Sequence, residues 1–279
     1  MLMNMRELLG RAQEEGKAVG AFNVVDSTTV RAVIDAAQTL DRPVILAFAE
    51  VHRDLIPLWM IAGLMLDAAR RANVPVAVHL DHGTDEAYIR EAIDLGFGSV
   101  MFDGSALPYE ENIRKTADIA AYAHAMGVSV EGELGQMTTG EDGAARPDAC
   151  YTDPEQAADF VSATGADFLA IAFGTQHGIY AQAPKLSFDI VRRVRGATRV
   201  PLVMHGGSGV KTEEFHRAIE SGIRKINYFT YMSLAGAQGA ASYAQRTRTP
   251  QFHLMAEEAR IAMQRDVEKA IRTFQLMDA

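Results

Sequence analysis

Four histidines stand where predicted β-strands end, and such positions meet at one face of a parallel barrel. They are His52, His82, His177 and His205. Three imidazoles beside one open coordination position form a common catalytic zinc site. One such histidine alone usually has a structural role, but three at the same face favour metal binding.

Two glutamates on one predicted strand, Glu131 and Glu133, stand two residues apart and therefore share a face. A carboxylate there can bind the metal itself, or it can accept a hydrogen bond from a metal-binding histidine and fix its orientation. The spacing leaves both roles open.

Two segments that could bind an anion follow later strands, and the first of them is rich in glycine. The segment His205-Gly206-Gly207-Ser208-Gly209 follows the seventh predicted strand, and residues 227–230 follow the eighth. Glycines let backbone N–H groups converge on an anion, and the hydroxyl of Ser208 or Thr230 adds a donor. Each segment alone would be an ordinary turn, but in an eight-stranded barrel these two loops often hold a phosphate. We therefore expect a phosphate site there.

A long stretch without periodicity separates the fifth strand from the next helix. It runs for about 19 residues, from Gly135 to Asp153, and loops of this length are usually lids or binding loops. Glu141 and Asp142, between two glycines, could swing into the site as a general acid or base. A solvated acidic loop is the alternative.

The elements that must position these groups are short apolar runs alternating with helical patterns. The runs are continuous, as expected for parallel strands covered on both faces. The predicted strands are Val19–Val25, Pro43–Glu50, Pro75–Asp81, Ser99–Asp103, Val128–Glu133, Asp167–Gly174, Val200–His205 and Ile223–Tyr228. The predicted helices between them are Thr28–Leu40, Leu58–Arg71, Asp85–Leu95, Glu110–Met126, Pro154–Thr164, Phe188–Val194 and Thr212–Ser221, followed by Met232–Tyr243 and Met255–Phe274.

Eight β/α units predict an α/β protein, a single (β/α)8 TIM-barrel domain over residues 1–279 with extra C-terminal helices. A doubly wound open sheet is the alternative. It usually carries a phosphate-binding glycine fingerprint after its first strand, whereas that turn here reads Asp26-Ser27-Thr28-Thr29.

Composition limits the function classes. The 279 residues include 27 Lys and Arg against 36 Asp and Glu, a net charge of −9, with no dense basic run, which argues against nucleic-acid partners. The single cysteine, Cys150, allows no intrachain disulfide, which fits a reducing compartment. The first residues lack the apolar core of a secretory signal, and the apolar stretch Leu55–Leu66 is too short to span a bilayer. We expect a cytoplasmic protein without membrane partners, with that stretch in a buried helix.

Ten short motifs follow one another along the chain. They are AFNV at 21–24, HLDHG at 79–83, SVMFDGS at 99–105, VEGELG at 130–135, GEDG at 140–143, YTDPEQA at 151–157, GTQHGIY at 174–180, PKLSFD at 184–189, MHGGSG at 204–209 and GIRKINYFT at 222–230. In kind and order, over about 210 residues, they resemble the class II, zinc-dependent fructose/tagatose-bisphosphate aldolase family. Each motif alone is weak evidence, but the joint match is specific.

This resemblance implies an aldehyde-lyase of carbohydrate metabolism. Such an enzyme reversibly cleaves a phosphorylated ketose to dihydroxyacetone phosphate and an aldehyde through a zinc-stabilised enediolate. The resemblance implies that His82, His177 and His205 bind one catalytic Zn²⁺ per subunit, with Glu133 as an alternative ligand or a group behind the ligands. Asp81 would handle the proton of the substrate hydroxyl, and Glu141 the proton at the enolate carbon.

The resemblance also implies a set of substrate-binding residues, a second bound ion and a homo-oligomer. The implied substrate-binding residues are Asn23, Gly178, Gly206, Gly207, Ser208, Asn227 and Thr230. A monovalent cation, Na⁺ or K⁺, is expected near the backbone of Gln176, Gly178 and Gly206. A homodimer or homotetramer is expected as well.

The sequence departs from the family where relatives hold the distal phosphate. Ala181 stands where many have a lysine, Ala49 where many have serine or threonine, and Gln251 near an expected arginine that Arg260 could replace. Each lost cation–phosphate contact costs about 1.5–3 kcal/mol. We therefore expect a preferred ketose other than fructose 1,6-bisphosphate.

The residues that follow Ala49 offer a replacement contact. We expect Glu50 and His52 to recognise a polar group at the distal end of the substrate. A structural salt bridge between Glu50 and Arg53, or a neighbour, is the alternative.

Other functions remain open at this point. A non-catalytic barrel that binds sugar phosphates would have no need for Asp81 and Glu141. A metal-dependent epimerase or isomerase of sugar phosphates also forms enediolates. A Schiff-base aldolase is disfavoured, because the lysine nearest a strand end, Lys225, lies within the eighth predicted strand.

Overall fold

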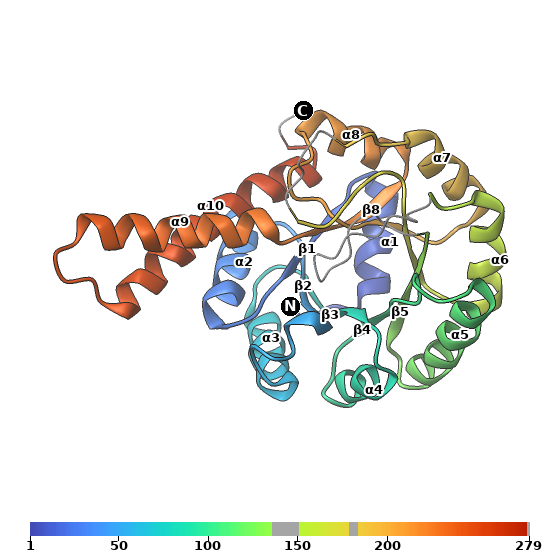
Figure 1. Cartoon of the computed structure of the whole chain (residues 1–279), viewed down its shortest axis with the longest axis horizontal. Coiled ribbons are helices and arrows are strands. Elements are labelled where there is room, and N and C mark those ends of the chain that lie inside the picture. The colour runs from blue at the N-terminus through green and yellow to red at the C-terminus, as the bar shows by residue number, and fades with distance from the viewer. Residues whose placement is uncertain (136–150, 179–183, 278–279) are drawn as a thin grey trace.

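The strands close into a parallel barrel in chain order, with β8 paired to β1 (Figure 1). The computed structural model describes residues 1–135, 151–178 and 184–277. Residues Val19–Phe22 pair with Lys225–Tyr228, so the first and last strands meet. The predicted TIM barrel is therefore confirmed, and the open sheet is excluded because an open sheet has two unpaired edges.

All eight predicted strands are present, with ends that differ by a few residues. They are β1 (Val19–Asn23), β2 (Val44–Ala49), β3 (Val76–Gly83), β4 (Ser99–Phe102), β5 (Ser129–Leu134), β6 (Phe168–Ile171), β7 (Leu202–Met204) and β8 (Ile223–Tyr228). The helices are α1 (Met5–Glu15), α2 (Ser27–Leu40), the short 3-10 helix η1 (Glu50–His52), α3 (Leu58–Arg71), α4 (Glu86–Asp94), α5 (Tyr109–Ala125), α6 (Pro154–Thr164), α7 (Phe188–Ala197), α8 (Thr212–Ser221), α9 (Thr230–Arg246) and α10 (Phe252–Phe274).

Helix α1 is absent from the sequence prediction. The Asn4 side chain caps its start by accepting from Arg6 N at 2.8 Å, and Gly16 ends it with a left-handed φ of 68°. Its buried face, with Met5 and Leu9 fully buried, packs into one core with the inward side chains of the strands. The helix therefore closes one end of the barrel.

The barrel interior changes from apolar to polar along several strands, β3 among them. Inward residues recur every second position, so on β3 Ala77 is followed by His79 and Asp81. The inward residues near the start of a strand, such as Ala77, belong to the core around α1. Further along the same strand, His79 and Asp81 are fully buried polar groups. A second, larger core lies between the outer faces of the strands and the helices. The polar end is the end where chemistry occurs in this fold.

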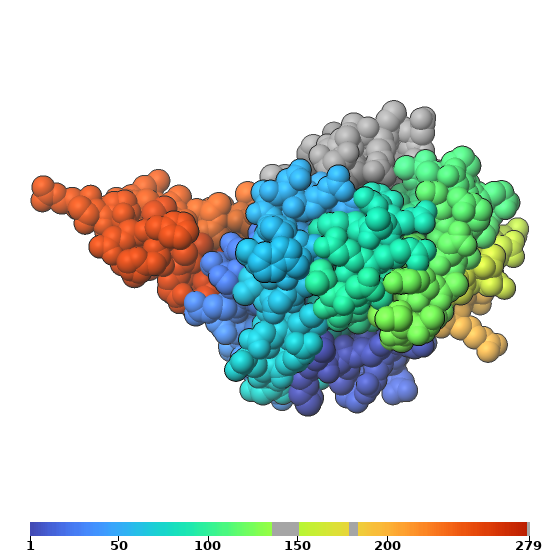
Figure 2. All heavy atoms as spheres, turned by 90° about the horizontal axis from the view of Figure 1, so that it is seen from below, coloured from blue at the N-terminus to red at the C-terminus, as the bar shows by residue number. Residues whose placement is uncertain are grey.

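Helices α9 and α10 form a hairpin that projects beyond α2 (Figures 1 and 2). Arg260 of α10 donates to Asp35 of α2 at 2.9 Å and to Glu257 at 2.7 and 2.9 Å. The suggestion that Arg260 replaces a distal phosphate contact is therefore wrong: its guanidinium fastens the hairpin to the barrel.

The stretch Leu55–Leu66 is only partly a buried helix. Helix α3 begins at Leu58 and buries one face, while Leu55 and Trp59 are 70% and 60% exposed. The apolar run therefore covers both a buried and a solvent face. Within the residues that the structure describes, no helix combines the length and apolar character needed to cross a membrane.

Candidate active site

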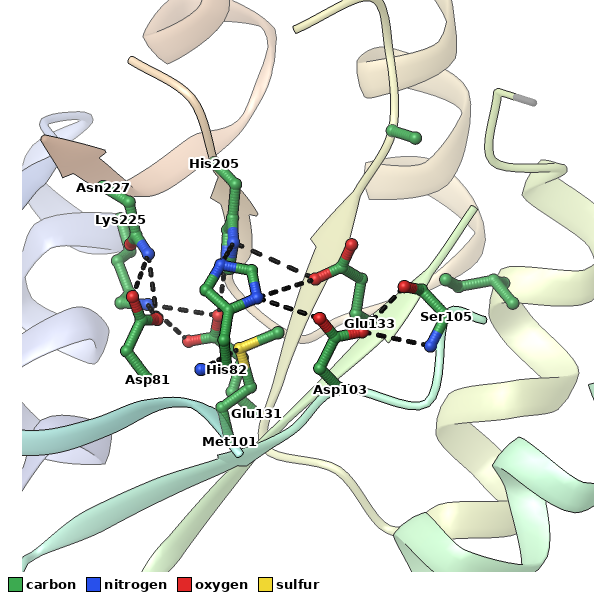
Figure 3. Close-up of polar contacts among 12 residues, drawn as sticks. Asp81, His82, Met101, Asp103, Ser105, Glu131, Glu133, His205, Lys225 and Asn227 are labelled. Atoms are coloured by element: carbon green, nitrogen blue, oxygen red, sulfur yellow. Dashed lines mark hydrogen bonds and ion pairs between the residues drawn. The ribbon is translucent and has the colours of Figure 1, made fainter. Parts of the chain in front are cut away.

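An irregularity at the end of β3 brings two adjacent functional side chains inward. The register of β3 against β4 shifts between Leu80 and Gly83. His82 has a left-handed backbone, with φ of 47°. Neighbouring residues of a regular strand face opposite sides, but here both Asp81 and His82 contact groups inside the barrel mouth (Figure 3). Such strained backbone is typical of functional sites.

Three imidazoles converge at this mouth, one from the end of β3 and two from the segments that follow β6 and β7. One ring nitrogen each of His82, His177 and His205 lies within 4.8 Å of the others. Nε2 of His82 and Nδ1 of His205 are 2.7 Å apart. The structure thus brings together the three predicted metal ligands, a donor set that suits Zn²⁺.

Carboxylates bind the outer nitrogens of two of these rings (Figure 3). Nδ1 of His82 lies 2.9 Å from Asp103, and Nε2 of His205 lies 2.9 Å from Glu131. When both rings are neutral, the proton of each belongs on its outer nitrogen, and two lone pairs then face each other across 2.7 Å. These lone pairs repel unless a cation lies between them, and the geometry fits a metal ion there.

Burial keeps the rings in the form that binds metal. It lowers the pKa of His177 well below its ordinary value, and the neighbouring His82 lowers it further. Burial also lowers the pKa of His205, and the hydrogen bond to Glu131 only partly opposes this shift. Neutral imidazole is the ligating form, so burial favours metal binding by His177 and His205.

The two glutamates of β5 have different surroundings, which bear on whether each binds the metal or orients a metal-binding histidine. Glu131 accepts from His205 and so orients a ligand. A carboxylate oxygen of buried Glu133 lies 3.9 Å from Nδ1 of both His82 and His205. Glu133 is thus placed beside the rings, in keeping with its predicted role as an alternative ligand.

Asp81 is fully buried between two amides. It accepts from Asn227 Nδ2 at 2.9 and 3.0 Å and from Asn23 Nδ2 at 3.1 Å. Burial alone would raise the pKa of Asp81, but the fields of His82 and Lys225 outweigh it and hold the pKa well below its ordinary value. Asp81 is therefore an ionised acceptor held in one orientation.

A buried lysine lies beneath this site. Lys225 Nζ donates to both oxygens of Glu131, at 2.8 and 3.1 Å, and lies 3.8 Å from Asp81. Burial would raise the pKa of Glu131, but Lys225 and His205 lower it to about 2. Burial and Lys225 together lower the pKa of His79 to about 3, so that ring is neutral. The ammonium of Lys225 thus lies close to two buried carboxylates, those of Glu131 and Asp81.

The predicted phosphate cradle lies around one cavity of about 180 Å³. Gly206 has φ of 67°, and its Cα is too close to the Gln176 carbonyl to carry a side chain. Helix α9 begins at Thr230, and Tyr231 N lies 3.4 Å from Ser208 Oγ. N–H groups at a helix start favour an anion. The cavity is lined by Asn23, His52, His177, Gly178, Gly206, Gly207, Ser208, Asn227, Tyr228, Phe229 and Thr230.

The distal-end expectation for Glu50 is wrong. Its buried carboxylate accepts from Thr84 N at 2.6 Å and Asp85 N at 3.1 Å, and it pairs with Arg53 at 3.3 Å. Glu50 therefore fixes the loop after β3, which is the structural alternative. His52 does line the cavity.

Neither Ala49 nor Gln251 lines the cavity. Ala49 is buried in β2, in register with Asp81, and Gln251 is exposed where α10 begins. Glu141 and Ala181 lie outside the described residues.

Sequence reasoning assigned no role to Asp103 or to the ion pairs of Lys225. The signal for Asp103 was its place directly after β4, the strand that pairs with the one carrying His82. The signal for Lys225 was its position two residues before Asn227, on the same inward face.

Replacing Asp103 by asparagine should weaken zinc binding about 10- to 100-fold, because His82 loses the carboxylate that fixes its tautomer. Competition with a chromophoric chelator would measure this affinity. Asp118→Asn, at an exposed carboxylate paired with Arg114, is the control and should bind zinc like the wild type. Equal affinities in all three proteins would contradict the assignment.

The family model described as fructose-bisphosphate aldolase class-II matches residues 3–279. The fructose-bisphosphate aldolase of Staphylococcus epidermidis is 38% identical over 281 residues, covering 98% of this chain and 97% of that protein. The fructose-bisphosphate aldolase of Geobacillus stearothermophilus is 42% identical over 239 residues, covering 84% and 83%. The crystal structure of the YdjI aldolase from Escherichia coli K12 matches with a TM-score of 0.87 and 36% identity, covering 98% and 97%. With sequence and fold agreeing over nearly its whole length, the chain belongs to the class II fructose-bisphosphate aldolase family.

Proposed function

We propose that this chain is a zinc-dependent aldolase that reversibly cleaves a phosphorylated ketose to dihydroxyacetone phosphate and an aldehyde. The observation that carries the proposal is the imidazole cluster, backed by Asp103 and Glu131, beside a cavity with a glycine-rich wall. His82, His177 and His205 would hold the zinc ion, with Glu133 as an alternative ligand. When bound, this ion would act as a Lewis acid toward the ketose carbonyl.

Asp81 is proposed to act on the hydroxyl of the carbon that becomes the aldehyde. As that proton moves to Asp81, the C–O bond becomes a carbonyl and the neighbouring C–C bond breaks. Its electron pair goes to the fragment that carries the phosphate. Asn23 and Asn227 hold Asp81 for this transfer. Glu141 would return a proton to the phosphate-bearing fragment, a role that rests on the family resemblance.

The cradle is proposed to bind the phosphate of the dihydroxyacetone phosphate half. Backbone N–H groups of Gly178, Gly206 and Gly207 and the start of α9 would face it, with the hydroxyls of Ser208 and Thr230. Among the described residues, neither lysine nor arginine lines the cavity. At the distal end, Ala181 and Gln251 stand where many relatives are expected to have cationic side chains, so we propose a preferred ketose other than fructose 1,6-bisphosphate.

Three further proposals rest on the resemblance. A Na⁺ or K⁺ ion would bind near the backbone of Gln176, Gly178 and Gly206. The protein would act in the cytoplasm. It would assemble as a homodimer or homotetramer, and the projecting hairpin of α9 and α10 offers a surface for this.

The test is release of dihydroxyacetone phosphate by the purified protein, with and without chelator. The substrates are fructose 1,6-bisphosphate, tagatose 1,6-bisphosphate and the matching ketose 1-phosphates. We expect release that chelator abolishes and zinc restores, with the ketose 1-phosphates preferred. Full activity after metal removal would refute the zinc proposal, and a strong preference for fructose 1,6-bisphosphate would refute the substrate proposal.

A further inference from the structure

The ammonium of Lys225 is surrounded by side chains that can each bind a metal ion. Its Nζ atom lies 2.8 and 3.1 Å from the oxygens of Glu131, 3.4 Å from Nε2 of His79 and 3.8 Å from an oxygen of Asp81 (Figure 3). All four side chains are fully buried. One ligating atom from each of the three neighbours lies within 4.8 Å of the others. The ammonium therefore lies where a metal ion bound to these three residues would lie.

The hydrogen bonds of His79 give its ring the form that binds a cation. Nδ1 lies 2.9 Å from Ser99 Oγ, and Nε2 faces the ammonium. An ammonium group can only donate, so Nε2 is the acceptor and the ring proton belongs on Nδ1. One imidazole and two carboxylates form a donor set that suits Zn²⁺ or Mn²⁺. This set shares no residue with the imidazole cluster of the proposed zinc site.

The charge of this group explains why a cation is needed there. Two carboxylates buried together are costly unless a positive charge lies beside them. A divalent ion would supply that charge, but it would also bind an oxygen of Asp81, which is proposed to take the proton of the substrate hydroxyl. The ammonium is beyond hydrogen-bond distance of Asp81, at 3.8 Å, and leaves that oxygen unbound to metal.

We infer that the ammonium of Lys225 occupies a second metal site and keeps a divalent ion away from Asp81. The ligands of that site are His79, Asp81 and Glu131. Lys225 is thus a positioning residue, because it also holds both oxygens of Glu131 in place behind His205. The existence of the second site does not depend on the reaction, whereas its effect on Asp81 rests on the proposed function.

The experiment removes the ammonium and asks whether a metal ion takes its place. Zinc-loaded wild type and zinc-loaded Lys225→Ala are titrated with Mn²⁺, and the loss of the electron paramagnetic resonance signal of free Mn²⁺ counts the bound ions. Lys225→Ala should bind one Mn²⁺ per chain in addition to its zinc, and the wild type should bind none at the same concentration. Elemental analysis shows that the zinc is retained in both proteins.

Two controls connect this Mn²⁺ to the proposed ligands. Adding His79→Leu to Lys225→Ala removes one ligand and leaves the imidazole cluster intact, so it should weaken Mn²⁺ binding by at least about 10- to 100-fold, the loss for a group behind a ligand. Lys17→Ala, at a partly exposed lysine paired with Glu15, should bind Mn²⁺ like the wild type.

The stability of the variant gives a second measurement. Mn²⁺ should raise the melting temperature of Lys225→Ala more than that of the wild type, because the ion binds the folded chain. If Lys225→Ala is unfolded without metal, refolding from urea with Mn²⁺ should restore the circular dichroism of the wild type.

Three results would overturn the inference. They are a folded Lys225→Ala that binds no additional ion, a chain that does not refold with Mn²⁺, and a wild type whose Mn²⁺ binding His79→Leu abolishes. Failure of the zinc-loaded wild type to release dihydroxyacetone phosphate would instead overturn the proposed function, and the metal counts would be unaffected.

Discussion

Replacing Asp81 by asparagine is expected to lower the rate of ketose cleavage about 10²- to 10⁴-fold, the range for loss of a general acid or base. Asparagine keeps the volume of the buried side chain and one acceptor oxygen for the amides of Asn23 and Asn227. It cannot take the proton of the substrate hydroxyl. The loss should therefore lie in kcat, with a small change in KM.

Two measurements distinguish this role from damage to the metal site. Asp81 is not among the proposed ligands, so Asp81→Asn should retain zinc by elemental analysis. Exchange of a dihydroxyacetone phosphate proton with D2O should also persist, because Asp81 is proposed to act on the aldehyde half. His205→Ala is the contrasting variant, which should lose zinc and both reactions together. Loss of exchange and zinc in Asp81→Asn would show that the residue supports the metal instead.

Replacing Lys225 by methionine should lower the free energy of unfolding by about 3–5 kcal/mol, the usual cost of removing one partner from a buried ion pair. Lys225, Glu131 and Asp81 are all fully buried, and the ammonium lies within 3.1 Å of both Glu131 oxygens. Methionine fills a similar volume but leaves two carboxylates without their shared cation. Urea unfolding followed by circular dichroism measures the change.

A second variant and a surface control make this result specific. Adding Glu131→Gln to Lys225→Met removes one of the two carboxylates left without a cationic partner, and it should recover part of the lost stability. Lys17→Met, at a partly exposed lysine paired with Glu15, should change the unfolding free energy by less than about 1 kcal/mol. A similar small change for Lys225→Met would show that the buried network contributes little to stability.

Much of the barrel and of the metal site could be predicted because both follow from local patterns. Continuous apolar runs indicate parallel strands, and the residues that end them share one face. The strand ends offered four histidines, the family resemblance singled out His82, His177 and His205, and the structure brings these three together.

Contacts set by strand register were not predictable. The pairing of Asp103 with His82 depends on a bulge between β3 and β4 that no sequence signal marks. Glu50 and His52 are two residues apart, and the sequence offered both as substrate contacts. The turn of η1 directs Glu50 to the loop after β3 and leaves His52 at the cavity. Helix α1 was missed although Asn4 and Gly16 are good caps and its buried residues have the ordinary spacing of an amphipathic helix.

The pairing of β1 with β8 has a consequence for how the protein folds. This seam joins opposite ends of the chain, so the ring cannot close until the last strand has been made and has returned to the first. Closing so large a loop costs entropy before the seam contributes any contacts, and folds rich in such distant contacts form slowly. Until closure, the buried face of α1 lacks the complete ring of strands against which it packs. A newly made chain therefore passes through an open state that exposes apolar surface. Substitutions in β1 or β8 at this seam should reduce the yield of folded protein more than equally buried substitutions elsewhere in the barrel.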